Sequence, residues 1–308
     1  MAALNVALHR PGRRRLRQRD IVPYVFILPN LILFSVFVLG PVLFSFGMSF
    51  TNWDGLGPAT FTGLRNYAKL LTDDLFGTAV RNTFAYSFGT VLPMMAIALG
   101  LALMLNSRIR GRTFFRTVVY LPVVISWVAG ALIWRLMFLH PDGIINAILG
   151  NFGLEPQLWT GDPMLALPAI MWMSFWKGLG FFTVIYLAGL QTIPPTLHEA
   201  GMIDGANRWQ LFWGITLPLL RPTTLFALVI GIIGSFEVFV PVLLMTNGGP
   251  GYASMVMVMA IYRSAFVTHE MGYASAMAVA LFLAMFAISW LNVREFSDLS
   301  RNSVKKLP

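Results

Sequence analysis

Cysteine is absent from this chain of 308 residues, and charged side chains are scarce. Without cysteine there can be no disulfide framework, no thiolate metal ligand and no cysteine nucleophile. Charged residues make up 11% and hydrophobic residues 57%, whereas a soluble domain has about 25% and about 45–50%. One core cannot bury so much apolar surface, so the composition predicts a membrane protein. The histidines are too scattered to predict a metal cluster; they are His9, His140, His198 and His269.

Motifs of nucleotide binding and hydrolysis are also missing. A phosphate-binding P-loop needs a lysine directly after a glycine. None of the four lysines follows a glycine; they are Lys69, Lys177, Lys305 and Lys306. The chain contains neither HExxH nor GxSxG, which mark metalloproteases and serine hydrolases. A membrane-embedded enzyme therefore has little support, and energy for transport would come from a partner or an ion gradient.

Apolar runs long enough to cross a bilayer make up most of the chain. A hydrocarbon core of about 30 Å needs about 20 residues at about 1.5 Å per residue. Glycine and proline inside these runs are tolerated where neighbouring helices satisfy the freed backbone groups. We therefore expect an all-α bundle of six transmembrane helices, at about 24–50, 79–106, 117–139, 165–190, 221–246 and 271–292.

The basic residues predict the orientation of this bundle. Sixteen lysines and arginines lie in the two termini and in the loops 107–116 and 191–221, against three in the alternate connections. Positive residues favour the cytoplasmic side, so both termini are expected there. The net charge of +9 is then explained by topology and anionic lipid, without nucleic acid. The chain divides into a basic tail, 1–20, a transmembrane domain, 21–292, and a second basic tail, 293–308.

The first apolar run is predicted to remain in the protein. It follows a basic segment, as the apolar part of a signal peptide does, but it is longer than such a segment and lacks a defensible small-residue cleavage site. We therefore expect an uncleaved transmembrane helix.

A polar, glycine-containing segment from Thr196 to Pro218 interrupts the apolar runs. Thr196 and Glu199 have the spacing of a capping box, which predicts a helix beginning at Leu197. Gly205 is placed to end it in the left-handed conformation. About eight residues span roughly 12 Å, too short to cross a membrane, and so short a helix needs a surface to pack against. It could be an interfacial helix with Glu199 as a cap, or a docking element.

The same segment, within a loop at 194–220, resembles the EAA loop of ABC importer permeases. The pattern is EAA, three residues, glycine, nine residues, isoleucine, one residue and LP, and it fits here without a gap. The matching residues are Glu199, Ala200, Gly201, Gly205, Ile215, Leu217 and Pro218, with Asp204 and Ala206 beside the central glycine. Gly201 replaces the second alanine, which is expected to loosen the helix slightly without preventing docking.

Other segments between about Tyr24 and Asn292 are similar to the carbohydrate branch of that family, which includes maltose permeases. They are FTGLRNYAKLL, RTVVYLP, IPPTLHEA, ITLPLLRPT, TNGGP and GYASAMAV. The resemblance implies a type I permease fold in a bacterial inner membrane, with a coupling helix seated in a groove of a cytoplasmic ATPase. Glu199, Ala200, Gly201, Asp204, Gly205 and Ala206 would be coupling residues without a catalytic role.

The resemblance also implies partners and a division of labour. Two cytoplasmic ATPase subunits would bind ATP and Mg²⁺, and this chain would bind no cofactor. A second, homologous permease would complete the pathway, and an extracytoplasmic solute-binding protein would deliver a sugar.

Of the charged residues in or at the edges of the predicted spans, two stand out, Lys177 in the fourth span and Glu237 in the fifth. Such residues are candidates for a functional site because burying them in a membrane is costly. They could instead form a structural ion pair. The resemblance to maltose-type permeases places sugar-lining positions on or beside these charges: Lys177, Gly178, Phe181, Gly234, Ser235 and Val238, with Glu237 adjacent. Gly234 and Val238 are poor hydrogen bonders, so the substrate is expected to bind differently from maltose.

The function we expect is that of a permease subunit that imports a sugar. Glycerol 3-phosphate or another polyol compound is the alternative substrate, because Lys177 and Arg135 could meet a phosphate. A proton-coupled secondary transporter that uses Lys177 and Glu237 is a rival, but it leaves the EAA spacing unexplained.

Overall fold

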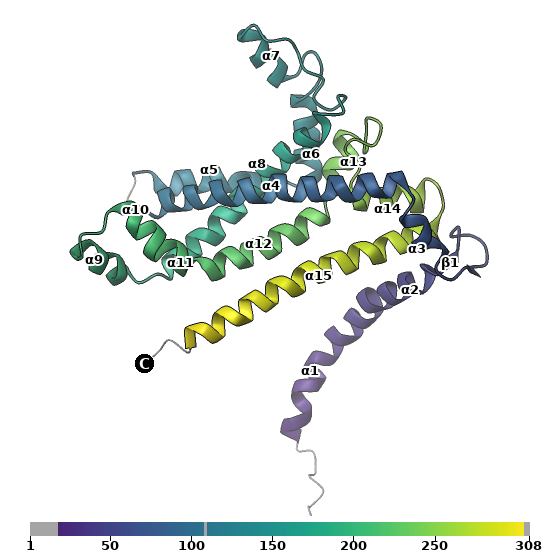
Figure 1. The fold of residues 1–308 in the computed structure, drawn as a ribbon, viewed down its shortest axis with the longest axis horizontal. Coiled ribbons are helices and arrows are strands. Elements are labelled where there is room, and N and C mark those ends of the chain that lie inside the picture. Colours follow the sequence, from purple (N-terminus) through teal and green to yellow (C-terminus); the bar gives the residue numbers. More distant parts are fainter. Residues whose placement is uncertain (1–17, 108–109, 305–308) are drawn as a thin grey trace, which may run out of the picture. The chain divides into compact units, whose positions relative to one another are not determined.

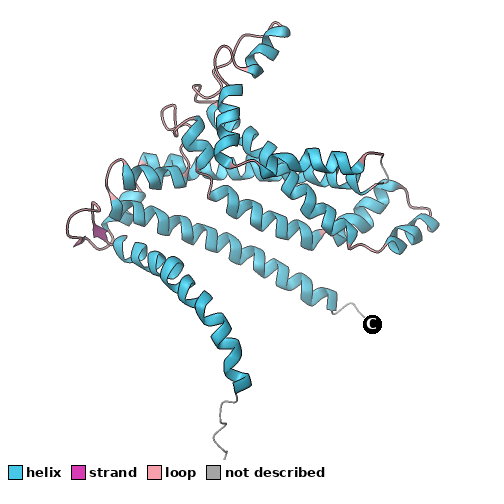
Figure 2. Ribbon diagram, turned by 180° about the vertical axis from the view of Figure 1, so that it is seen from behind, coloured by secondary structure: helices cyan, strands magenta, loops and turns pink. Residues whose placement is uncertain are grey.

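The computed structural model describes residues 18–107 and 110–304, with side chains within 24–107 and 110–290. The chain forms two compact units, Met1–Gly47 and Met48–Pro308. Nearly all of the regular structure described is helical (Figure 2). In that part of the chain the strands are β1, Thr51–Asn52, and β2, Thr60–Phe61, an antiparallel pair. The all-α architecture predicted from the apolar runs is confirmed.

The part of the first unit that the structure describes, from Gln18 on, is a long apolar helix with a local change of pitch. Its segments are α1, Gln18–Phe34, the π-helical turn η1, Ser35–Leu39, and α2, Gly40–Met48. Pro41 lies two residues after the end of the π-turn. Because proline has no N–H, it cannot bond to the carbonyl of Phe37 one turn earlier, and a π-turn accommodates the irregularity without ending the helix. The 25 residues Tyr24–Met48 are long and apolar enough to span a membrane.

The second unit is built around long helices that pack closely. They are α4, Asp74–Asn106, α8, Ala166–Gln191, and α15, Met271–Val304. α4 and α8 run side by side (Figure 1). Ala98 and Ala102 of α4 are fully buried, and a Cβ on Gly178 of α8 would lie 2.6 Å from the Met94 sulfur. Small residues allow such close approach, as at many helix contacts in membranes.

Two helix pairs are sharply bent. α5, Arg112–Val124, and α6, Trp127–Met137, meet at 98°, so the span expected at 117–139 is broken near Ile125. The segment Arg208–Leu219 meets α12, Arg221–Phe236, at 62°. Within the described residues, four helices are long and apolar enough to cross a membrane, or up to six if each bent pair is one span.

The span expected at 221–246 is also interrupted. α12 ends at Phe236, and α13, Val240–Met245, begins after three residues. Pro241 lies in the first turn of α13, where its missing N–H is harmless. The interruption leaves Glu237 at the end of a helix, away from the middle of one.

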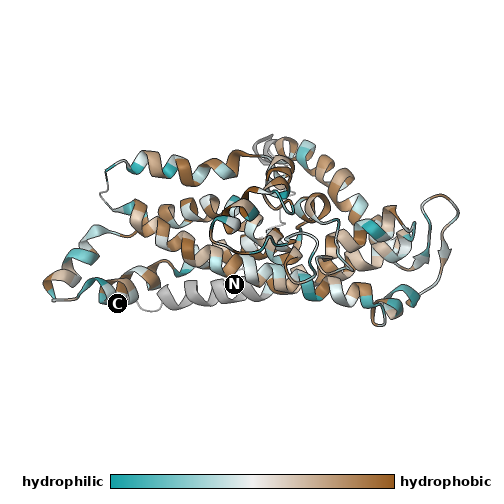
Figure 3. Cartoon of the chain, turned by 90° about the horizontal axis from the view of Figure 1, so that it is seen from above, coloured by the Kyte–Doolittle hydropathy of each residue, from teal (hydrophilic) through white to brown (hydrophobic). Residues whose placement is uncertain are grey.

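Shorter helices complete the second unit. They are α3, Arg65–Leu70; α7, Ile144–Asn151; α9, Pro195–Ile203; α10, Arg208–Leu211; the π-turn η2, Phe212–Thr216; α11, Leu217–Leu219; and α14, Met257–Phe266. Hydrophobic residues dominate the long helices, and hydrophilic residues gather toward their ends and in the connections (Figure 3). α15 continues past residue 292 to Val304, so the segment predicted as a tail from 293 is helical there. Residues 1–17 of the predicted basic tail lie outside the described residues.

Candidate functional site

The predicted coupling segment forms a short helix, but it begins differently from the prediction. α9 starts at Pro195 with Pro194 as its N-cap, and no side chain caps it. Proline suits the first helical position because its φ is already helical and its N–H would have no partner there. Thr196 consequently lies inside the first turn, where its hydroxyl cannot act as a cap. The capping box predicted for Thr196 and Glu199 is wrong.

The end of α9 follows the prediction for Gly205. This glycine has φ +83°, in the left-handed region. Its N–H donates to Met202 O at 3.1 Å, and the N–H of Ala206 donates to Gly201 O at 2.9 Å. These two bonds form a Schellman motif, which satisfies carbonyls that the helix end would leave unpaired. Gly205 therefore fixes the length of α9 at nine residues.

Gly201 is the point of closest contact between α9 and the chain that follows it. A Cβ at this position would lie 2.6 Å from Leu211 Cδ2 and 3.2 Å from Ile215 Cδ1. On the same side of α9, His198 Nε2 and Thr216 Oγ1 are 3.1 Å apart. The sequence suggested that glycine here loosens the helix, whereas the structure shows it permits α9 to lie against the return segment.

Asn207 and Gln210 form the capping box that the sequence analysis missed. Asn207 Oδ1 accepts from the N–H of Gln210 at 2.9 Å, and Gln210 Oε1 accepts from the N–H of Asn207 at 2.7 Å. Asparagine followed three residues later by glutamine is a recognised signal for a capping box, so this signal was present in the sequence. The box starts α10 immediately after the Schellman motif and sets the direction of the return path.

No side chain of α9 is buried, and most are exposed. The exposed set combines two carboxylates with apolar side chains: Glu199, Asp204, Ala200, Met202 and Ile203. Ile203 is 87% exposed. Exposed apolar side chains gathered on a short helix are typical of a surface that contacts another protein or a membrane.

The predicted substrate-pathway residues line two adjoining cavities. Five of them lie at the first cavity, of about 270 Å³, which also reaches α4 and the α5–α6 break. The other two lie at the second cavity, of about 300 Å³, together with Gly234. The first set is Lys177, Gly178, Phe181, Gly234 and Ser235; the second is Glu237 and Val238. Tyr86 and Trp127, which the sequence analysis did not single out, line both cavities.

Lys177 is bonded to the backbone of the α5–α6 break. Its side-chain nitrogen donates to the carbonyls of Pro122 at 3.3 Å, Val123 at 3.4 Å, and Ile125. An ammonium group has three N–H donors, so these three carbonyls use all the donors of Lys177. Among the described residues no ion pair joins Lys177 to Glu237. The structural ion pair considered from the sequence is therefore not formed, and Lys177 has no donor left for a sugar hydroxyl.

Ser235 is also engaged within the protein. Its hydroxyl lies 2.6 Å from Ser87 Oγ on α4 and 2.7 Å from the carbonyl of Ile232. Glu237 differs, because its side chain is exposed at the second cavity and has no hydrogen bond or ion pair recorded within the described part of the chain. Of the polar groups predicted for the pathway, the Glu237 carboxylate is the one left open to a ligand.

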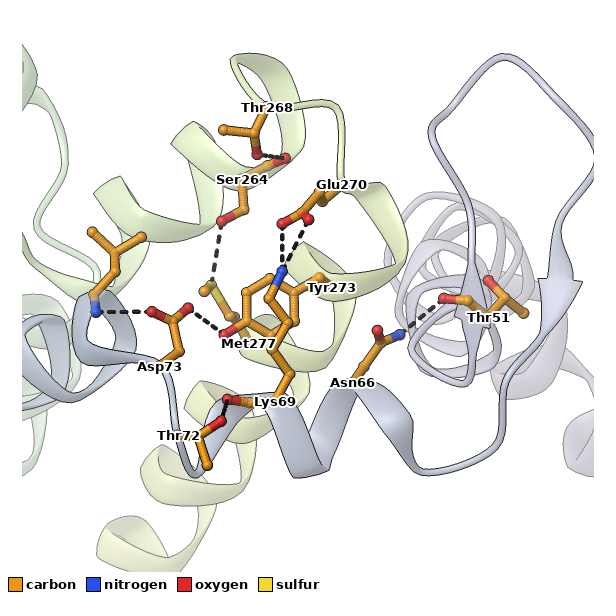
Figure 4. A network of polar contacts seen from close by, with 11 residues as sticks. Thr51, Asn66, Lys69, Thr72, Asp73, Ser264, Thr268, Glu270, Tyr273 and Met277 are labelled. Atoms are coloured by element: carbon orange, nitrogen blue, oxygen red, sulfur yellow. Dashed lines mark hydrogen bonds and ion pairs between the residues drawn. The ribbon is translucent and has the colours of Figure 1, made fainter.

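A polar cluster fixes the other end of the second unit (Figure 4). Lys69 Nζ lies 2.8 Å from Glu270 Oε2 and 4.0 Å from the centre of the Tyr273 ring. The Tyr273 hydroxyl donates to Asp73 Oδ2 at 2.5 Å. A Cβ on Gly272 would lie 2.0 Å from the backbone oxygen of Thr51, so only glycine fits. These contacts join α3, the start of α4 and the start of α15.

One exposed carboxylate in the β1–β2 connection has a lowered pKa. Hydrogen bonds from the backbone N–H groups of Gly57 and Leu56 lower the pKa of Asp54, because they favour its ionised form. Asp54 therefore holds this turn together at neutral pH.

A family model and a curated relative match most of the chain. The model, described as binding-protein-dependent transport system inner membrane component, matches residues 94–294. The probable ABC transporter permease protein YurN of Bacillus subtilis is 34% identical over 284 residues, which cover 91% of this chain and 97% of that protein.

Two further relatives have sugars in their names. The trehalose/maltose transport system permease protein MalF of Thermococcus litoralis is 35% identical over 276 residues, covering 89% of this chain and 93% of that protein. A chain of a bacterial alginate ABC transporter, solved in complex with an alginate pentasaccharide-bound periplasmic protein, is 29% identical with a TM-score of 0.78, and the match covers 89% of this chain and 93% of that one.

The helical membrane bundle and these relatives define a transport subunit rather than an enzyme. The chain belongs to the family of binding-protein-dependent transport system inner membrane components, among its carbohydrate ABC importer permeases.

Proposed function

We propose that this chain is the permease subunit of an importer in which α9 transmits ATP hydrolysis by a partner ATPase to the movement of a sugar. The observation that carries the proposal is α9 itself, a nine-residue helix closed by a Schellman motif, with no buried side chain. Such a helix is too short to be stable alone in water. A groove on a cytoplasmic ATPase would supply the missing contacts.

The residues that would enter this groove are those predicted from the EAA loop. Glu199 and Asp204 supply negative charge, and Ala200 with the neighbouring apolar side chains supplies a surface to bury. Gly201, Gly205 and Ala206 shape the helix and its exit. None of them is proposed to be catalytic.

The partners follow from this role. Two ATPase subunits would bind ATP and Mg²⁺, a second homologous permease would share the pathway, and an extracytoplasmic binding protein would deliver substrate on the other side. Both termini would be cytoplasmic, as the basic residues favour. ATP binding would draw the coupling helices together and rock the helices between two states, a rigid-body change.

A sugar is favoured over glycerol 3-phosphate as the substrate. The two cavities offer aromatic walls from Phe181, Tyr86 and Trp127 and one open carboxylate, Glu237. Aromatic rings can cover the apolar face of a sugar, and a carboxylate can accept from its hydroxyls. A phosphate would need free cationic donors at the cavities, but the donors of Lys177 are used and Arg135 lines neither cavity. The relatives named for trehalose, maltose and alginate also support a sugar as the substrate.

Two substitutions in the coupling segment test the proposal. Glu199→Lys reverses a charge on the docking face, and Gly205→Val forces a β-branched residue into φ +83°. We expect at least a tenfold loss of uptake, with the ATPase either lost on purification or active without substrate. The measurements are co-purification of the ATPase, ATP hydrolysis and uptake by the reconstituted importer.

Matched controls come from the other side of the molecule. Gly153 has φ +73° at the end of α7, and Glu155 is an exposed carboxylate beside it. Gly153→Val and Glu155→Lys should leave co-purification of the ATPase unchanged. Normal uptake in both coupling variants would refute the role of α9.

A further inference from the structure

The α5–α6 break exposes backbone groups that a membrane helix normally hides. The last carbonyls of α5 have no partner further along the helix, and the chain turns by 98° before α6 begins. Unpaired carbonyls are costly within a membrane, because no water is available to them. A bend of this size needs a protein group, or water in a cavity, to satisfy these oxygens.

Lys177 supplies that group from α8. Its three N–H donors match three carbonyls at the break, those of Pro122, Val123 and Ile125, although Ile125 is 52 residues away in the sequence. The ammonium also lies at the carboxyl end of α5, where the helix dipole favours a positive charge. The side chain is 6% exposed, so this contact accounts for a lysine that would otherwise be buried at a high cost.

The same contact orients Trp127. The Lys177 nitrogen lies 5.0 Å from the centre of the Trp127 ring, within the range of a cation–π interaction. Trp127 is the first residue of α6, directly after the N-cap Ser126, whose hydroxyl accepts from the N–H of Ala129. The indole lines both cavities and is 44% exposed. Its position depends on where α6 begins, and hence on the bend.

We propose that Lys177 is a positioning residue that holds the α5–α6 break and thereby places Trp127 as a wall against which the substrate ring packs. Lys177 acts through the backbone and does not bind the substrate. The assignment of the substrate role to Trp127 rests on the proposed function, whereas the effect of Lys177 on the bend does not.

The bend can be measured directly because the chain has no cysteine. Thr113→Cys on α5 and Leu136→Cys on α6 introduce two spin labels in the assembled importer, without substrate or ATP. From about 1.5 Å per residue and the 98° bend, the labelled backbone positions are roughly 23 Å apart, against roughly 35 Å for a straight helix. Electron–electron double resonance resolves this difference.

Lys177→Met removes the donors and keeps a long side chain. We expect its label distance to lengthen by at least about 5 Å on this geometry, or its distribution to broaden twofold. Lys177→Arg keeps the charge and donors and should restore the wild-type distance. Arg81→Met, which removes an exposed cation from α4, is the control and should leave the distance unchanged. An unchanged distance in Lys177→Met would overturn the proposal.

A measurement on the unmutated protein covers the case in which Lys177→Met does not fold. Reductive methylation requires an accessible amine, so Lys177, 6% exposed, should react at least tenfold more slowly than Lys69, which is paired with Glu270 but has a side chain 44% exposed. Mass spectrometry of peptides measures both rates. Equal rates at the two lysines would contradict the three hydrogen bonds and with them the proposal.

The role of Trp127 is tested by substrate stimulation of ATP hydrolysis. Trp127→Leu and Lys177→Met should each raise the half-stimulating concentration of the substrate-loaded binding protein about tenfold, with little change in the maximal rate. The double variant should match the single ones, because Lys177 acts through Trp127. Additive effects of the two substitutions would show that Lys177 and Trp127 act independently, and would refute the action of Lys177 through Trp127. If ATP hydrolysis by the wild type is not stimulated at all, the proposed function is contradicted. The label distances would still test the effect of Lys177 on the bend.

Discussion

At the scale of single residues, Gly201 inside α9 and Gly205 just after its end have different structural roles. Gly205 has a left-handed backbone that an L-residue adopts with strain. Gly201 has an ordinary helical backbone, but its missing Cβ makes room for Leu211. A sequence pattern identifies the first kind from its place at a helix end. The second kind becomes visible only when the neighbouring segment is in position.

Gly201→Ala should therefore have an effect that depends on Leu211. Alanine favours a helix by about 1 kcal/mol over glycine, but overpacking costs about 1–3 kcal/mol, so the contact at 2.6 Å should decide the outcome. We expect a net destabilisation of α9 by about 1 kcal/mol. In a Leu211→Val background, which lacks the Cδ2 atom, Ile215 Cδ1 at 3.2 Å is the remaining close contact, so the same substitution should stabilise α9 by up to about 1 kcal/mol.

Hydrogen exchange of the α9 amides in the full chain measures both values. The difference between the two backgrounds is the coupling energy of a double-mutant cycle. The same effect of Gly201→Ala in both backgrounds would show that Leu211 does not limit position 201.

At the scale of elements, the molecule depends on contacts that tie helix ends together. Lys177 joins α8 to the end of α5, and the cluster around Lys69 and Tyr273 joins α3 to α4 and α15 (Figure 4). Helices that lie against lipid gain little from apolar burial. Polar contacts and close approaches of backbone at their ends therefore have a large share in fixing their arrangement.

Gly272→Ala should disturb the start of α15. Its Cβ would lie 2.0 Å from Thr51 O, a backbone atom, so β1 or α15 must move. We expect a loss of about 3 kcal/mol, at the upper end of the usual cost of overpacking, seen as a lower midpoint of thermal unfolding in detergent.

Gly77→Ala is the matched control in the first turn of α4. A Cβ there meets nothing within 4 Å, so the substitution should stabilise the protein by about 0.5–1 kcal/mol. Equal midpoints for the two variants would show that the approach of Gly272 to Thr51 is not tight in solution.

At the scale of the whole molecule, the distribution of basic residues favours the orientation that the proposed function requires. The coupling segment and the loop at 107–116 must face the ATPase, and α7 must face the binding protein. The excess of arginine in 107–116 favours this arrangement.

Single cysteines in the cysteine-free chain test this orientation. Ser107→Cys should react with a membrane-impermeant maleimide only after the cells are opened, whereas Asn151→Cys at the end of α7 should react on intact cells. Both side chains are exposed, so accessibility within the protein does not limit labelling. Labelling of Ser107→Cys on intact cells would reverse the topology and place α9 on the wrong side for an ATPase.

The sequence by itself determined the class of fold, the end of α9 and the family. These depend on local causes: apolar runs of sufficient length, and a glycine whose backbone freedom suits a helix end. Even the missed capping box, Asn207 with Gln210, was present in the local sequence.

Only the tertiary structure decided the roles of Lys177, Ser235 and Gly272. Sequence reasoning expected Lys177 to meet a substrate or Glu237, but its partners are backbone carbonyls more than 50 residues away. No periodicity encodes such a contact, because it arises where one helix bends beside another. The 98° break and the lysine that satisfies it explain each other physically, and neither could be inferred from its own segment of sequence.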